Sequence, residues 1–179
     1  MNREETELKT ILLQEGVIRS ENGGYVPGNG AVLSISRESP LYLRYNFMAH
    51  EGFHGIYFID ENFRSTVDTV YAETDERAVR FIKNYFELVP TLGYDTDDTY
   101  LLKNEFMGYL MQQSLERVGP YFSGSVLNRF LQSGGDASIG QYIGNTRASD
   151  LVTAATIIND YVFNHWGLAG GRVGLFYSQ

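Results

Sequence analysis

The feature that most constrains this chain is a pair of histidines, His50 and His54, placed one helical turn apart within an apolar stretch. Residues four positions apart lie on the same face of an α-helix, so both imidazoles can bind one metal ion. Glu51 would project beside the metal, where its carboxylate can take a proton from a bound water. The pattern therefore predicts a metal-binding helix, from about Tyr42 to Phe58. The alternative is an ordinary helix whose two histidines are satisfied inside the protein.

The absence of cysteine narrows the choice of metal ligands. None of the 179 residues is a cysteine, so any metal must be bound by His, Asp or Glu side chains. Two histidines separated by one helical turn, with a glutamate beside them, are typical of a zinc site. We therefore expect Zn²⁺ as the cofactor.

Two glutamates compete for the position of third ligand. Glu73 is followed at once by a polar run, residues 74–77, that suits the start of a solvated helix. Glu105 lies in the middle of a predicted helix and has mostly apolar neighbours at helical spacing. An unpaired charge in such a place would be costly, and a metal ion would remove that cost. The local environment therefore favours Glu105.

The whole pattern predicts an α+β protein that is predominantly helical, in a single domain spanning residues 1–179. Apart from the metal-binding helix, the expected helices cover residues 5–14, 75–89, 98–117, 122–131 and 149–165. A small β-sheet or hairpin is expected before the metal-binding helix. Residues 172–177 are a candidate for a terminal strand.

The small sheet is predicted from Ala31–Ser36, where apolar and polar residues alternate. An edge strand there could hold an extended peptide through its backbone, and an ordinary half-buried hairpin is the alternative. Gly52 and Gly55 each cost about 1 kcal/mol relative to alanine within a helix. Two glycines so close together indicate that another element packs closely against the metal-binding helix.

Charge and hydropathy restrict the partners. The formal net charge of −8, with no cluster of Lys or Arg, argues against nucleic acid, because a phosphate backbone would be repelled. No run approaches the roughly 20 apolar residues of a membrane span. The acidic residues 1–7 precede no apolar run of signal-peptide length, so the chain as given is not expected to be exported. A piece cut from a longer exported protein would look the same, which leaves the compartment open.

Two motifs together resemble those of a known family: residues 50–55, His-Glu-Gly-Phe-His-Gly, and residues 104–110, Asn-Glu-Phe-Met-Gly-Tyr-Leu. They are similar to the motifs of gluzincin zinc metallopeptidases, and specifically of a poorly characterised bacterial group in that class. The resemblance implies a zincin-like domain that hydrolyses peptide or protein substrates. It also implies that His50, His54 and Glu105 bind zinc and that Glu51 is the catalytic base.

The comparison with the family's motifs affects the choice of third ligand and the surroundings of the metal. Glu73 follows His54 by 19 residues and Glu105 follows it by 51. The aminopeptidase-like gluzincins use the shorter separation, so spacing alone favours Glu73 as the third ligand. Tyr109 stands where thermolysin-like members place an aspartate, which changes the residues around the metal ligands.

The implied reaction is the hydrolysis of a peptide bond. Three protein ligands leave one zinc position open to water, whose pKa falls to about 7 on the metal. Glu51 would take the proton and pass it to the leaving amine. Candidates for stabilising the oxyanion are Tyr109, Tyr121, His165 and Arg172, with a preference for Tyr109 and Arg172. The alternative function is a catalytically inactive, metallopeptidase-like module that binds zinc or another protein.

Overall fold

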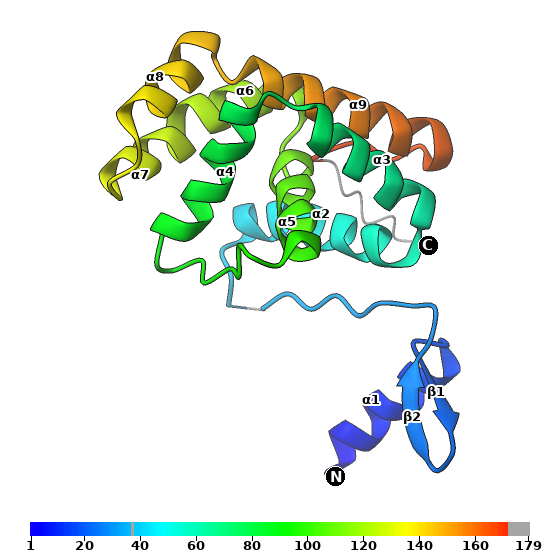
Figure 1. Cartoon of the computed structure of the whole chain (residues 1–179). Coiled ribbons are helices and arrows are strands. Elements are labelled where there is room, and N and C mark those ends of the chain that lie inside the picture. Colours follow the sequence, from blue (N-terminus) through cyan, green and yellow to red (C-terminus); the bar gives the residue numbers. More distant parts are fainter. Residues whose placement is uncertain (37, 172–179) are drawn as a thin grey trace.

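A computed structural model describes residues 1–36 and 38–171 and is predominantly helical (Figure 1). The helices are α1 (Arg3–Gln14), α2 (Leu41–Ile59), α3 (Glu61–Glu73), α4 (Glu76–Leu88), α5 (Thr99–Met111), α6 (Leu115–Pro120), α7 (Leu127–Gln132), α8 (Ala137–Thr146) and α9 (Ser149–Trp166). A π-helical segment, η1 (Tyr121–Val126), joins α6 to α7. The strands β1 (Ile18–Glu21) and β2 (Gly24–Pro27) form an antiparallel hairpin. The predicted helical class, with a hairpin before the histidine-bearing helix, is confirmed.

The N-terminal part of the chain is organised by local hydrogen bonds. Asn2 caps α1 by accepting from the Glu5 backbone N–H, and the Glu5 side chain accepts from the Asn2 N–H in return. The hairpin turns at Asn22-Gly23, whose φ angles of 49° and 80° are both in the left-handed region that a tight two-residue turn requires. In Figure 1 this blue segment stands apart from the other helices, and none of the described residues 1–36 is buried.

The turn from α2 into α3 depends on Asp60 and Arg64. Asp60 ends α2, and its side chain caps α3 by accepting from the Phe63 N–H at 2.6 Å. The Arg64 guanidinium donates to the carbonyl oxygens of Tyr57 and Phe58, which α2 leaves unpaired at its end. The sequence pattern predicts no helix over residues 61–73, because one residue, Asp60, both ends α2 and caps α3. Helix α3 is therefore a correction, and so is α8.

Helix α5 is central to the helical part of the protein (green in Figure 1) and contacts α2, α3 and α9. Asp98, at which the predicted helix begins, caps α5 by accepting from two backbone N–H groups. Residues 105–112 are all buried, so the second half of the helix has no solvated face. The helix ends at Met111, earlier than the predicted residue 117. The Met111 carbonyl instead accepts from the Gly171 N–H at 2.8 Å, and α6 begins separately.

The structure also bears on the predicted strand at residues 31–36 and on the two glycines of α2. Residues 31–36 form no strand, because β1 and β2 pair with each other and the described residues offer no further partner strand. A Cβ added at Gly52 would meet nothing within 4 Å, and one at Gly55 would make only ordinary contacts. Neither glycine is therefore required by a close helix approach, which corrects that expectation.

The candidate strand at 172–177 lies outside the described residues. Within them, no helix is long and apolar enough to cross a bilayer.

Candidate metal centre

The contact between α2 and α5 brings His50, His54 and Glu105 together. The Nε2 atoms of the two imidazoles are 2.9 Å apart. Glu105 Oε2 lies 3.4 Å from Nε2 of His50, and Glu105 Oε1 lies 3.5 Å from Nε2 of His54. Four side-chain atoms from two helices therefore converge on one point.

These separations fit a metal ion. Tetrahedral zinc with ligand distances of about 2.0–2.1 Å holds neighbouring ligand atoms about 3.3 Å apart, close to the distances found here. The Glu105 side chain is only 9% exposed, and its Oε2 atom is buried without a hydrogen-bond partner. A buried carboxylate oxygen with no partner is costly, and a bound cation would remove that cost. The three side chains can therefore hold a metal ion.

Asn104 sets the orientation of His54. The Nδ1–H of His54 donates to Asn104 Oδ1 at 2.8 Å, which leaves the Nε2 lone pair directed toward Glu105. Burial, and secondarily the neighbouring His50, lowers the pKa of His54. A lowered pKa favours the neutral imidazole, which is the form that binds metals. Sequence reasoning gave Asn104 no role, although its place immediately before Glu105 was an available signal.

Gly108 allows the two helices to approach so closely. A Cβ on Gly108 would lie 2.8 Å from Cε1 of His54 and 2.9 Å from Cε1 of His50, which is closer than real contacts of this kind. The absence of a side chain on α5 therefore makes room for both imidazoles. The close approach that the sequence suggested does exist, but its glycine is on α5 rather than on α2.

Glu51 and two tyrosines surround the cluster. Glu51 is half-buried on α2, close enough for its charge to act on His54 and Tyr94. Tyr109 is buried, and its ring packs edge-on against His50, with centroids 5.3 Å apart. Its position beside the cluster agrees with its choice as a candidate.

Tyr94 is a candidate that sequence reasoning missed. It lies in the loop between α4 and α5 and interacts with both Glu105 and Tyr109. Burial first, and then the negative charge of Glu105, raise the pKa of Tyr94, so its hydroxyl stays protonated and can donate a hydrogen bond. No periodicity marks a loop residue of this kind, because only the folded chain places it near Glu105.

Of the other candidates, Glu73 and His165 lie outside the cluster of His50, His54 and Glu105. Glu73 is exposed at the end of α3, where it lines a hollow of about 200 Å³ together with Asp75 and Asp150. His165 is exposed on α9 and stacks on Tyr161, with ring centroids 4.0 Å apart. Tyr121 accepts a hydrogen bond from Gln112 Nε2 at 2.9 Å. Arg172 falls outside the described residues.

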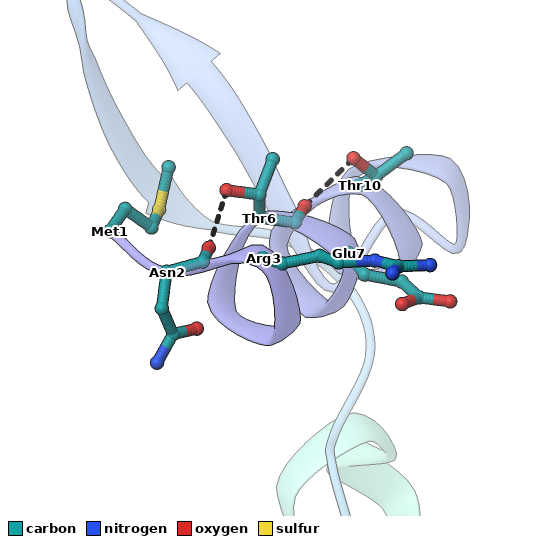
Figure 2. Close-up of a pocket in the computed structure, with 6 residues that line it drawn as sticks. All are labelled: Met1, Asn2, Arg3, Thr6, Glu7 and Thr10. Atoms are coloured by element: carbon teal, nitrogen blue, oxygen red, sulfur yellow. Dashed lines mark hydrogen bonds between the residues drawn. The ribbon is translucent and has the colours of Figure 1, made fainter.

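A hollow of about 570 Å³ lies along the start of α1, away from the metal centre (Figure 2). Its lining residues are Met1, Asn2, Arg3, Thr6, Glu7 and Thr10. The hydroxyls of Thr6 and Thr10 donate to carbonyl oxygens one turn earlier, so they are already satisfied. We assign no function to this hollow.

Comparison of the chain with protein-family models, with curated proteins and with solved structures finds no match.

Proposed function

We propose that the protein is a zinc-dependent peptidase of the gluzincin type, with a zincin-like domain. The observation that supports this most directly is the position of Glu105, whose buried and unpartnered Oε2 lies against Nε2 of His50 while its Oε1 lies against Nε2 of His54. His50, His54 and Glu105 are then the zinc ligands. Two imidazoles and one carboxylate are a ligand set found in catalytic zinc sites, which keep a further position open.

Zinc in this site would act as a Lewis acid, lowering the pKa of water to about 7 and polarising the peptide carbonyl. Glu51 is half-buried next to His50, where its carboxylate can accept a proton and return it to the leaving amine. The protonated Tyr94 hydroxyl, which interacts with Glu105, would be the donor to charge that develops on the substrate. Tyr109 supports His50 through ring contact and is the second candidate for that donor role. The preference for Arg172 remains a prediction.

The variant Glu51→Gln tests the proposal, because it removes the base and preserves the shape of the side chain. We expect bound zinc to be unchanged and hydrolysis of a peptide library to fall at least about 100-fold, the scale of a positioned acid–base group. Zinc content is measured on the purified proteins, and cleavage is measured by mass spectrometry. Equal turnover by the variant would refute the mechanism, and a wild-type protein that binds no zinc would refute the site.

A metallopeptidase-like binding module without turnover is the second candidate function. The hollows at α1 and at the contact of α3 with α9 lie away from the metal centre, since neither is lined by His50, Glu51, His54 or Glu105, and such hollows favour this reading. A protein that binds zinc stoichiometrically, yet cleaves nothing in either form, would identify it as such a module.

A further inference from the structure

Helix α2 presents two exposed aromatic side chains on the same face as Glu51. Phe47 is 41% exposed and Phe58 is 50% exposed. Phe47 precedes Glu51 by four positions and Phe58 follows it by seven, so the three side chains form one stripe along the helix. The buried positions of α2, which include Ala49, Phe53 and Tyr57, belong to another face. The stripe is therefore a surface feature that continues on both sides of the candidate base.

The chain segment before α2 runs beside this stripe. A Cβ on Gly55 would lie 3.7 Å from the Leu33 side chain and 3.9 Å from that of Ala31. Nearer the end of α2, residues 28 and 29 line a hollow of about 470 Å³ together with Phe58, Ile59, Asp60, Glu61 and Arg64. Figure 1 shows the segment as a long connection between the hairpin and α2. At the Phe58 end of α2, residues 28 and 29 of this segment form one wall of a groove that is also lined by Phe58.

Residues 28 and 29 of this wall are tied to residues 17 and 16 by backbone hydrogen bonds. By contrast, among the described residues no backbone–backbone hydrogen bond involves residues 30–35, whose backbone is unpaired. Backbone groups of an unpaired, exposed segment can bind an extended peptide in the manner of an added strand. The chain carries a net charge of −8, and the hollow beside Phe58 includes two carboxylates against one guanidinium. Acidic peptides are therefore disfavoured as occupants.

The spacing of the two aromatics can be compared with that of a peptide. The 11 positions from Phe47 to Phe58 cover about 16 Å of helix axis, and an extended chain rises about 3.3 Å per residue. About five peptide residues therefore span the distance. The histidine nitrogens come from positions 50 and 54, close to the midpoint between the two aromatics. Each aromatic then lies two or three peptide residues away from the metal centre.

We infer that the substrate is an extended, non-acidic peptide lying along α2, in which Phe47 and Phe58 select large apolar side chains on opposite sides of the cleaved bond. The selected positions are two to three residues from that bond rather than adjacent to it. This inference rests on the proposed peptidase function and specifies its substrate.

A binding experiment tests the groove without requiring turnover. Zinc-loaded Glu51→Gln protein is titrated with two ten-residue peptides. At the positions two and three residues from the central bond on either side, one peptide carries leucine and the other carries serine. The leucine peptide should bind about tenfold more tightly or better, because it buries apolar surface. The variants Phe47→Ser and Phe58→Ser should each remove most of that preference. Tyr45→Ser is the matched control: Tyr45 is 54% exposed on α2 but lies off the stripe, so the preference should persist. Equal affinity for the two peptides would overturn the inference.

Cleavage of a peptide library by proteins with Glu51 intact separates this inference from the proposed function. Phe47→Ser should relax the apolar preference on one side of the cleaved bond, and Phe58→Ser on the other. If the protein cleaves peptides but neither variant changes its cleavage profile, the proposed substrate groove is wrong and the peptidase function stands. If the protein binds the leucine peptide selectively but cleaves nothing, the groove is supported and the peptidase function is wrong. Neither binding nor cleavage would overturn both.

Discussion

The N-terminal segment and helix α5 show two different ways of holding a chain in place. Residues 1–36 have no buried side chain among them, and their helix and hairpin depend on local hydrogen bonds such as the reciprocal cap of Asn2 and Glu5. Residues 105–112 are all buried and are fixed by contacts from distant parts of the sequence. The candidate metal centre lies in the second environment. Substitutions should therefore have large effects at α5 and small, local effects near the N-terminus.

The largest expected effect is the loss of metal binding in Glu105→Ala. Removing a direct ligand should weaken zinc binding by more than the roughly 10- to 100-fold that is typical for residues behind the ligands. Glu73→Ala is the matched control, because Glu73 is an exposed glutamate at a helix end. Its affinity for zinc should equal that of the wild type, as measured by competition with a chelating dye.

The comparison of these two variants also decides between spacing and environment as guides to the third ligand. Loss of zinc only in Glu73→Ala would mean that an exposed helix end, and not the buried helix, supplies the carboxylate. The assignment of the metal centre to the buried part of the protein would then be wrong.

The sequence was most informative where geometry depends on neighbours along the chain. His50 and His54 share one helix, so helical periodicity alone predicts that their rings meet. The predicted start of the helix that carries Glu105, at Asp98, likewise coincides with the residue that caps α5. Glu105 was preferred over Glu73 because of its apolar neighbours, and the structure places Glu105 beside the histidines.

The sequence was least informative where tertiary contacts decide. Gly108 is significant only because both imidazoles lie against it, and Tyr94 only because its loop folds over Glu105. Helix α3 was missed because Asp60 ends one helix and caps the next. The strand predicted at Ala31–Ser36 was wrong, because alternation identifies a suitable segment but cannot supply its pairing partner.

An intermediate effect is expected for Gly108→Ala, which tests whether the buried helix tolerates even one methyl group. The added Cβ would overlap both imidazoles, so the free energy of unfolding should fall by about 1–3 kcal/mol, as for other overpacked cores. Zinc binding should weaken as well, because the imidazoles must move to make room. Urea denaturation of the metal-depleted protein and zinc titration measure the two effects separately.

Gly52→Ala is the control for the intrinsic effect of replacing a helical glycine. A Cβ there meets nothing within 4 Å, so the variant should keep its zinc affinity and gain up to about 1 kcal/mol of stability. If Gly108→Ala and Gly52→Ala had the same stability and zinc affinity, the contact at Gly108 would not be tight. Burial would then contribute little to the metal site.

The smallest effect is expected for Gly23→Ala in the hairpin turn. Gly23 has a φ of 80°, and an L-residue in the left-handed region costs about 1–2 kcal/mol, so the turn should open more often. That cost should stay within residues 18–27, because the hairpin contributes no buried side chain to the helical core. The overall unfolding free energy should change by less than about 0.5 kcal/mol, and zinc affinity should not change. Amide hydrogen exchange should accelerate across β1 and β2 while the amides of α5 remain as protected as in the wild type. Faster exchange in α5 as well would show that the hairpin stabilises the helical core, and the contrast between the two regions would then fail.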